Sequence, residues 1–333
     1  MLNKKFTLAG RPIGRPISDD DFDYKEEELR DLNDGELLLE NMVIEFQPAQ
    51  KGWMEQISNY VAPLEIGDVM RCSGIARVIE TKSEKYKKGD IVIGETCWQT
   101  HPILSHDKIE KVEDESMATK YLGALGGTGL TAYFGVTKIS KPKPGDTVLI
   151  TGAAGGVGSI AGQIFKIAGC KVIGIAGGKE KCDILIDEFG FDGAIDYRSD
   201  DLNDSIKKLC PEGVNVLYDN VGGRILNDCL NHLAMNARVA ICGIISRHKT
   251  DNSNFGPENY SNLIFKRATM QGFIVIDYMA EAETARKQIK NWISEGKINC
   301  KEDMQEGFEN APSTLRRLFE SKNKGKQLLK ITD

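Results

Sequence analysis

The sequence lacks the cysteine and histidine patterns by which metal sites and disulfide frameworks are recognised. Its eight cysteines are scattered without a C-x-x-C pair, and none of its four histidines has a histidine partner at i+4. We therefore expect no metal, and we expect the reduced thiols of a cytoplasmic protein in place of a disulfide framework. A metal site assembled from distant residues, such as Cys72 with His101, stays open as the alternative.

Long apolar runs and blocks of one charge sign are also missing. The apolar runs are strand-sized, well short of the roughly 18 residues of a membrane span, and the opening stretch MLNKKFTLAG has no apolar core typical of a secretory signal. The net charge is −6 with both signs interspersed, so no basic stripe is offered to nucleic acid. We expect neither a membrane nor a nucleic acid as partner.

The 333 residues suffice for two domains. Residues 1 to about 130 are β-rich: a long strand is predicted over Gly35–Phe46, and the stretch CSGIARVIETKSEKYKKGDIVIGETCW alternates as paired strands do. The acidic stretch Asp19–Glu28 is interpreted as a solvated surface loop.

From Pro142 onward, strand and helix patterns alternate, which predicts a doubly wound parallel sheet with crossover helices. The predicted strands are DTVLIT, CKVIGIAG, GAIDY, VNVLYDNVGG, ARVAICG and QGFIVIDY (Gln271–Tyr278); the predicted helices are GSIAGQIFKIAG, EKCDILIDEFG, LNDSIKKLC, ILNDCLNHLA and AEAETARKQIKNWISEG. A last strand is expected in KQLLKI.

The first of these strands runs into the glycine-rich turn TGAAGGVG, residues 151–158. Gly152, Gly155 and Gly158 are spaced by three, in a relative of the G-x-G-x-x-G fingerprint. In that fingerprint the glycines allow a sharp turn, close approach of backbone to a pyrophosphate, and tight packing of helix on sheet. A helix N-terminus then offers N–H groups to the phosphates. Because the turn opens a βαβ series, it predicts dinucleotide binding in place of a merely structural turn.

The end of the second strand indicates which dinucleotide is bound. NAD sites carry an Asp or Glu there for the ribose 2′-hydroxyl, whereas this strand ends in Ala176-Gly177-Gly178, followed by Lys179 and Lys181. A lysine would pair with a 2′-phosphate that an acid would repel. The pattern favours NADP(H), against the alternative that these are ordinary solvated lysines opening a helix.

Several stretches together carry a resemblance that runs over nearly the whole chain. They are YVAPLEIGDVMR (60–71), GGTGLTAYFG (126–135), the glycine turn with its helix and second strand (152–178), YDNVGG (218–223), CGIIS (242–246), GFIV (272–275) and NKGK (323–326). The sequence resembles the zinc-independent branch of the medium-chain dehydrogenases/reductases that contains leukotriene hydroxydehydrogenase/prostaglandin reductase, plant alkenal double-bond reductases and bacterial curcumin reductase.

The resemblance implies an α/β protein in which a Rossmann doubly wound parallel sheet binds NADP over residues 130–305. A β-rich, GroES-like catalytic domain would cover residues 1–129 with a C-terminal return at 306–333. It also implies a homodimer that reduces the C=C bond of a small hydrophobic α,β-unsaturated aldehyde or ketone with NADPH and without metal. Consistent with the missing metal, Gly67-Asp68-Val69-Met70 stands where zinc-dependent relatives carry Gly-His-Glu.

The resemblance also assigns positions in this sequence to the cofactor. They are Gly155, Gly156, Val157 and Gly158 for the pyrophosphate; Lys181 and Tyr197 for the 2′-phosphate; Asn220 near the ribose or nicotinamide; Cys242, Gly243, Ser246, His248, Phe273 and Val275 around the nicotinamide; and Asn323 from the C-terminal segment.

His248 is the main departure from the family pattern, because the family carries a tyrosine there. An imidazole can also donate a hydrogen bond. Three roles stay open for it: a donor to the substrate oxygen, an orienting group on the ribose, or a bystander. Tyr60 and Tyr260 are the other candidate catalytic donors, each with ordinary packing as its alternative. Two further functions stay open, namely an NADPH:quinone oxidoreductase and a non-catalytic NADP-binding protein.

Overall fold

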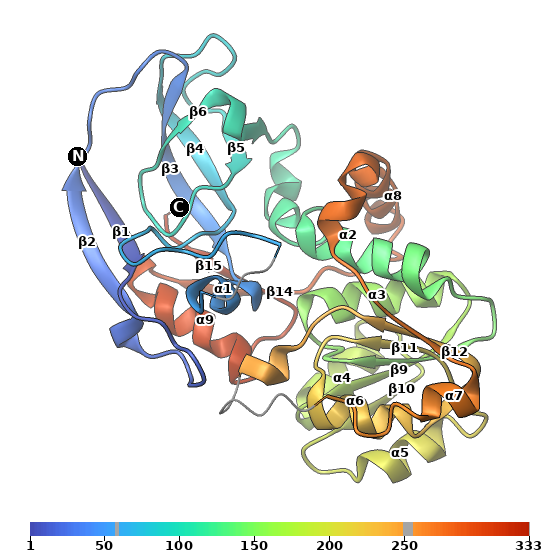
Figure 1. Ribbon diagram of the computed structural model, residues 1–333. Coiled ribbons are helices and arrows are strands. Elements are labelled where there is room, and N and C mark those ends of the chain that lie inside the picture. The colour runs from blue at the N-terminus through green and yellow to red at the C-terminus, as the bar shows by residue number, and fades with distance from the viewer. Residues whose placement is uncertain (57–59, 249–255, 333) are drawn as a thin grey trace. The chain divides into compact units, whose positions relative to one another are not determined.

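The computed structural model describes residues 1–56, 60–248 and 256–332, and for residues 247 and 248 only the backbone. The chain divides into two compact units (Figure 1). Unit 1 comprises Met1–Leu122 and Glu302–Asp333, and unit 2 comprises Gly123–Lys301.

Unit 1 is built on a mixed sheet with the strand order β14-β15-β3-β4-β5-β7, with β6 pairing β3 as well, while β1 and β2 pair with each other. Its strands are β1 Leu2–Leu8, β2 Phe22–Glu28, β3 Glu36–Glu45, β4 Gly74–Thr81, β5 Ile91–Gly94, β6 Ile103–Ser105, β7 Ile109–Lys111, β14 Glu302–Glu306 and β15 Lys326–Lys330; its helices are η1 Asp19–Asp21, α1 Ala49–Met54, η2 His106–Lys108, η3 Glu115–Leu122, η7 Phe308–Asn310 and α9 Ala311–Phe319.

The core of unit 1 is aromatic. Trp98 is fully buried and stacks on Phe22 at 5.4 Å, with Phe46 5.1 Å away on another side. Trp98 is therefore a core residue of unit 1, and the burial of its large apolar surface stabilises the folded state. A buried ion pair, Lys326 to Glu45 at 2.5 Å, joins β15 to the end of β3.

The acidic stretch 19–28 differs from the surface loop that its composition predicts. Residues Asp19–Asp21 form η1, and Phe22–Glu28 form β2, paired antiparallel with β1. The reason is that the neighbouring strand supplies lysines: Lys5 on β1 pairs with Glu27 at 2.6 Å. Cross-strand pairs of opposite charge stabilise a strand whose own sequence is too acidic to predict one.

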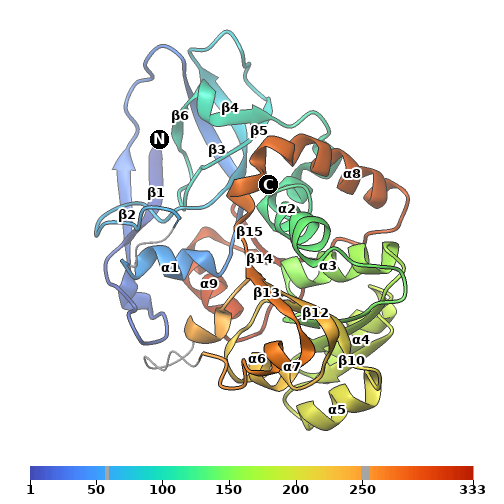
Figure 2. The same ribbon diagram turned by 45° about the vertical axis from the view of Figure 1, so that its right-hand side comes forward.

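Unit 2 contains the parallel sheet that the alternating pattern predicts (Figure 2). Its strands are β8 Thr147–Thr151, β9 Lys171–Ala176, β10 Gly193–Asp196, β11 Val214–Asp219, β12 Leu233–Ile241 and β13 Thr269–Gly272; its helices are α2 Gly127–Phe134, the π-helix η4 Gly135–Ser140, α3 Gly156–Ile167, α4 Lys179–Asp187, α5 Leu202–Leu209, α6 Gly223–Leu230, η5 Ile245–His248, α7 Asn262–Lys266, η6 Val275–Glu281 and α8 Ala282–Ser294.

The strand order of this sheet is β10-β9-β8-β11-β12-β13, and every neighbouring pair is parallel. The chain builds outward from β8 to β10 on one side, then returns to place β11 against β8. Helices α2 and α3 cover one face and α5 and α6 the other (Figures 1 and 2). The switch in direction therefore lies between β8 and β11, and the carboxyl ends of such strands form the usual ligand site of an open α/β sheet.

The predicted strand Gln271–Tyr278 is wrong over most of its length. β13 ends at Gly272, and Val275–Glu281 forms the 3-10 helix η6. Tyr278 stacks on Phe134 of α2 at 5.1 Å, and Val275 packs on the same apolar cluster. Burial of these side chains against α2 outweighs the strand preference of an apolar run. The helix predicted over Ile225–Ala234 likewise ends early, at Leu230.

None of the helices in the described part of the chain combines the length and the apolar character that a membrane span requires.

Candidate functional site

The glycine turn joins β8 to α3 and leaves its backbone N–H groups at the carboxyl edge of the sheet. Gly152 has φ +60°, a left-handed conformation that glycine adopts without strain. A Cβ on Gly158 would lie 2.5 Å from the carbonyl oxygen of Gly152, so helix and turn touch closely here. α3 begins at Gly156 after the N-cap residue Gly155, which provides no side-chain cap. The first-turn N–H groups are therefore available to an anion, and the turn fits a pyrophosphate.

Two side chains, those of Tyr197 and Arg198, lie at the end of β9, which stops at Ala176, and α4 begins three residues later. Lys181 lies in the first turn of α4 and is half-buried. The half-buried Tyr197 follows β10, and its ring and hydroxyl would both lie 2.9 Å from a Cβ at Gly177. Arg198 lies over the Tyr197 ring, 5.9 Å from its centroid, and its Nε is equally close to Gly177. A guanidinium and a phenol thus lie against the glycines where an NAD site would hold a carboxylate, and a lysine follows in the next helical turn.

Asp196 lies at the end of β10, and its carboxylate accepts hydrogen bonds from backbone N–H groups. Its Oδ1 accepts from the N–H of Gly178 at 2.7 Å and from the N–H of Arg198 at 3.0 Å. The hydrogen bond from Gly178, the larger influence, lowers the pKa of Asp196. The carboxylate therefore stays ionised and holds the turn after β9 beside the turn after β10.

Asn220, at the end of β11, is tied directly to the glycine turn. Its backbone N–H donates to the hydroxyl of Thr151 at 2.9 Å, and its Nδ2 donates to the Thr151 carbonyl at 2.8 Å. Asp219 beside it is fully buried, and Thr151 Oγ1 donates to its Oδ1 at 2.5 Å. Desolvation raises the pKa of Asp219 to about 6.

The segment after β12 packs on the turn after β11. A Cβ on Gly243 would lie 2.9 Å from the carbonyl oxygen of Asn220, so the two turns are in close contact. Ser246 donates through its hydroxyl to the carbonyl of Val221 at 2.6 Å. Desolvation raises the pKa of Cys242 to about 12, so its thiol stays protonated and is no general base.

Phe273 and Val275 follow β13, but both side chains have protein partners on the α2 side of the sheet. Phe273 meets Tyr218 edge-on at 6.4 Å, and Val275 belongs to the cluster around Leu130. Only their backbone groups, in the segment directly after the carboxyl end of β13, are free of that packing role.

The three candidate catalytic donors fall in different places. His248 closes the short helix η5, and its side chain lies outside the described residues. Tyr60 belongs to unit 1 and is 52% exposed. Tyr260 is 63% exposed, and the adjacent Asn259 donates to the carbonyl of Asn227 near the C-terminal end of α6. Since α6 starts at the carboxyl edge and rises about 12 Å over its eight residues, Tyr260 lies toward the opposite edge from Asn220.

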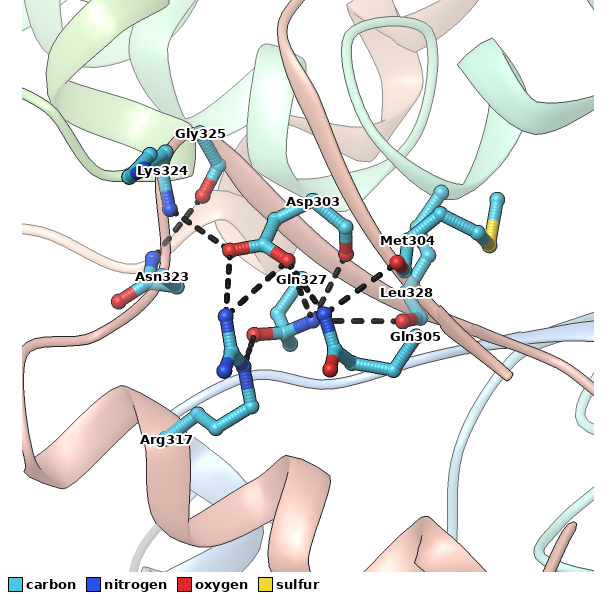
Figure 3. A network of polar contacts seen from close by, with 9 residues as sticks. All are labelled: Asp303, Met304, Gln305, Arg317, Asn323, Lys324, Gly325, Gln327 and Leu328. Carbon is cyan, nitrogen blue, oxygen red and sulfur yellow. Dashed lines mark hydrogen bonds and ion pairs between the residues drawn. The ribbon is translucent and has the colours of Figure 1, made fainter. Parts of the chain in front are cut away.

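Asn323 belongs to unit 1, in the loop between α9 and β15 that Figure 3 shows. Its Nδ2 donates to the carbonyl of Gly325 at 3.0 Å, and the next N–H, that of Lys324, donates to Asp303 at 3.0 Å. Asp303 is held in turn by Arg317 at 3.0 Å. The loop is therefore firmly placed within its own unit.

Within unit 2, the structure brings the predicted cofactor residues of the glycine turn, the end of β9, Asn220 and the segment 242–246 to one edge of one sheet. It does not bring Tyr260 there. Two residues of this edge were missed from sequence: Arg198, which follows the tyrosine in IDYRS, and Asp219, which precedes Asn220 in YDNVGG. The signal for Arg198 was a charged residue directly after the predicted strand GAIDY, and the signal for Asp219 was a charged residue where the apolar run of the segment VNVLYDNVGG ends.

Among residues 1–56, 60–248 and 256–332, no three histidine, cysteine, aspartate or glutamate side chains stand together as metal ligands would. The absence of a catalytic metal stays a prediction.

Two family models match the chain. Residues 4–112 match the N-terminal domain of oxidoreductase, and residues 156–291 match the zinc-binding dehydrogenase model. The chain is 35% identical over 335 residues to the NADPH-dependent curcumin reductase of Escherichia coli, covering 99% of this chain and 97% of that protein. It is 33% identical over 337 residues to the NADP-dependent 2-alkenal reductase of Nicotiana tabacum, covering 99% and 98%.

The crystal structure of CurA from Vibrio vulnificus in complex with NADPH is similar throughout. Its TM-score is 0.93 at 33% identity, and 99% of each chain is covered. The parallel sheet with its glycine turn and the separate mixed sheet are thus similar to those of CurA, which was solved with NADPH bound. The chain belongs to the medium-chain dehydrogenase/reductase superfamily, in the branch of the curcumin and 2-alkenal reductases.

Proposed function

We propose that this protein reduces the C=C bond of small, hydrophobic α,β-unsaturated aldehydes and ketones with NADPH. The observation that carries the proposal is the end of β9. There Tyr197 and Arg198 lie against Gly177, and Lys181 follows in the first turn of α4, in a chain that matches NADPH-dependent reductases over its full length. We propose that residues 130–305 bind the cofactor, while residues 1–129 and 306–333 form the catalytic domain.

NADPH, when bound, supplies a hydride to the β-carbon of the substrate. The chain's own contribution to cofactor binding begins with the N–H groups at the start of α3, which hold the pyrophosphate. Lys181, Tyr197 and Arg198 hold the 2′-phosphate through charge-assisted hydrogen bonds. Asn220, already oriented by Thr151, borders the nicotinamide end.

Charge reversal at Lys181 tests the cofactor assignment. Lys181→Glu should lower the NADPH-over-NADH preference at least 10- to 100-fold, because a hydrogen bond to a charged group is worth about 1.5–3 kcal/mol. Lys179→Glu is the matched control: Lys179 lies two residues earlier on the same helix, but its side chain is 85% exposed and its ammonium pairs with Asp183 at 2.7 Å. An unchanged cofactor preference in Lys181→Glu would remove this lysine from the 2′-phosphate site.

The reduction also needs a donor for the negative charge that grows on the carbonyl oxygen, since such donors stabilise the transition state. We propose His248 and Tyr60 for this role. NADPH consumption would be measured over enals, enones and quinones, with wild type, His248→Tyr, His248→Ala and Tyr60→Phe. Loss of turnover in His248→Ala with retention in His248→Tyr supports a donor at this position. Equal activity in wild type, His248→Tyr and His248→Ala makes His248 a bystander.

The same screen separates the alternatives for the whole protein. Turnover with an enal or enone well above that with a simple quinone supports the proposal. The reverse preference would make the protein a quinone oxidoreductase. NADPH binding without oxidation by any substrate would leave a cofactor-binding protein with no reductase activity.

We propose that the protein is a homodimer in which the edge strand β13 pairs with a second copy. β13 is the last strand of its sheet, and three of its four residues are exposed. Large apolar side chains on both flanking helices are exposed too, among them Ile264 at 72% and Phe265 at 67%. An unpaired edge beside exposed apolar side chains is typical of an association surface.

Sedimentation or light scattering tests the dimer. Wild type should weigh twice one chain at micromolar concentration, and Phe265→Glu should weaken association. Ile186→Glu, which charges an exposed isoleucine on α4, is the control that should change nothing. A monomeric wild type would contradict the proposal.

We propose a cytoplasmic location. No disulfide links the cysteines that the structure describes, and Cys72, Cys170, Cys210 and Cys229 are buried thiols, as is usual where thiols are kept reduced.

A further inference from the structure

Asp219 is a buried carboxylate that has no role in the cofactor binding or hydride transfer proposed above. It ends β11, the strand that lies beside β8 at the switch in chain direction. Its side chain is fully buried and accepts three hydrogen bonds: from the Thr151 hydroxyl at 2.5 Å, from the Gly222 N–H at 2.9 Å and from the Val221 N–H at 3.2 Å. A buried carboxylate that accepts three hydrogen bonds fixes the positions of the three groups that donate to it.

The donors come from segments that the cofactor site uses. Thr151 starts the glycine turn. Val221 and Gly222 form the turn after β11, where Gly222 has φ +72° and gains conformational freedom unless it is held. The same turn carries Asn220 on one side, and on the other its Val221 carbonyl accepts from Ser246.

The Asp219 backbone extends the connection to β12. Its carbonyl accepts from the N–H of Cys242 at 2.8 Å and of Gly243 at 3.1 Å. One residue therefore fastens the glycine turn, the turn 220–223 and the segment after β12 to each other.

We propose that Asp219 is a positioning residue for the cofactor, and that its ionised carboxylate is required to hold these three segments in the geometry that binds NADPH tightly. The inference rests on the proposed function in that it takes NADPH as the ligand of this edge. It adds a residue that touches neither cofactor nor substrate and acts through Thr151, Val221 and Gly222.

Ionisation matters because of what the carboxylate faces. All three partners are donors, and the ionised carboxylate accepts from them without giving a lone pair to a proton. A proton would take a lone pair from Oδ1, which receives the Thr151 and Val221 donors, or from Oδ2, which receives Gly222, and it would remove the negative charge that strengthens all three hydrogen bonds. In the part of the chain that the structure describes, Asp219 acts on the thiols of Cys229 on α6 and Cys242 after β12, and burial keeps both thiols neutral. Titration within this cluster is therefore that of Asp219.

The expected size of the effect follows from the pKa of about 6. If only the ionised form binds tightly, the apparent Kd equals the intrinsic Kd divided by the ionised fraction, which is about 0.9 at pH 7 and about 0.1 at pH 5. The Kd for NADPH should therefore rise about tenfold from pH 7 to pH 5 beyond any change shared with a variant that cannot titrate there.

Asp219→Asn is that variant. The Kd for NADPH would be measured by fluorescence titration from pH 5 to pH 8 in both proteins, with no substrate present. The 2′-phosphate of NADPH also titrates near pH 6, but it does so equally in both proteins and cancels in the ratio. We expect weaker binding in Asp219→Asn at pH 7, and a ratio between the two proteins that closes toward pH 5.

Thr151→Val gives a second, independent arm. Losing a donor to the ionised form should raise the pKa of Asp219 by about one to two units, so the pH at which binding weakens should move upward by as much. Thr151→Ser keeps the hydroxyl and should behave as wild type. Thr147→Val, at the other end of β8, is the control for the loss of a hydroxyl from this strand.

Hydrogen exchange of the peptide spanning 219–223 in the cofactor-free protein provides a readout without any ligand. Exchange should be faster in Asp219→Asn and Thr151→Val than in wild type at the same pH. Asp219→Asn and wild type with the same pH profile of Kd, or an unshifted profile in Thr151→Val, would overturn the inference. If wild type bound NADPH but reduced no enone, the proposed function would fail while this inference stood.

Discussion

Gly158→Ala is the single change that tests most directly how the glycine turn works. The added methyl carbon would lie 2.5 Å from the carbonyl oxygen of Gly152, and 2.9 Å and 3.1 Å from the Cα and carbonyl oxygen of Ala153. Every neighbour is backbone, so no side chain can rotate away. Carbon and carbonyl oxygen approach to about 3.3 Å at closest in folded proteins, so helix and turn must separate by about 0.8 Å.

Two opposing energies decide the stability of this variant. Overpacking of this kind costs about 1–3 kcal/mol, while replacing glycine by alanine in a helix returns about 1 kcal/mol. We therefore expect the free energy of unfolding to fall by up to about 2 kcal/mol. The cofactor effect is larger: a displaced turn misaligns the N–H groups at the start of α3, and each hydrogen bond to a charged group is worth about 1.5–3 kcal/mol. NADPH should bind about 10- to 100-fold more weakly.

Gly127→Ala is the matched control. Gly127 is also a glycine in the first turn of a helix, α2, and a Cβ there would meet nothing within 4 Å. Urea unfolding followed by circular dichroism measures stability, and fluorescence titration measures NADPH affinity. Gly127→Ala should keep its NADPH affinity and should keep its stability or gain up to about 1 kcal/mol. If Gly158→Ala bound NADPH within twofold of wild type, close contact between α3 and the glycine turn would not be what shapes the pyrophosphate site.

Three further outcomes are expected. Asp219 has an ordinary pKa when unfolded and a pKa of about 6 when folded; the folded state therefore binds the extra proton between these values, and from pH 4 to pH 6 wild type should lose about 2 kcal/mol of stability relative to Asp219→Asn, with no further difference above pH 7. Parallel urea titrations across pH check this, and equal slopes would contradict it. Arg198→Ala should raise the KM for NADPH about tenfold and leave that for NADH unchanged; a parallel rise in both would make the arginine merely structural. Lys326→Met strands the buried Glu45 carboxylate and should cost about 3–5 kcal/mol, most of which the added change Glu45→Leu should restore.

The strands and crossover helices of unit 2 up to β12 could be predicted because each segment carries its own signal. A strand such as Thr147–Thr151 is a short apolar run bounded by turn residues, and a helix such as Gly156–Ile167 has apolar residues at helical spacing. The signal failed where packing against a distant segment decides the structure. No local sequence signal marks where β13 ends and η6 begins, because η6 depends on the stacking of Tyr278 on Phe134, a residue 144 positions earlier in the sequence.

The candidate site divides in the same way. The glycine turn and Lys181 follow predicted strands and could be found from their position alone. Asp219 could not be given its role from sequence, because its partner Thr151 lies 68 residues away. That contact exists only because β11 returns to lie beside β8, a neighbour relation that the order of elements along the chain does not reveal.

The position of β15 has a consequence for how the protein is made. Unit 2 is one continuous segment, whereas the sheet of unit 1 places β15 between β14 and β3. On the ribosome, residues 123–301 are therefore all available before the strand that completes unit 1 emerges. Until then the edge of β3 at residues 43–45 has no partner strand, and the carboxylate of Glu45 lacks its ion pair with Lys326. The nascent chain thus passes through a stage in which the complete segment of unit 2 is attached to an unfinished sheet of unit 1, and chaperone protection is needed most by residues 1–122, which are synthesised first.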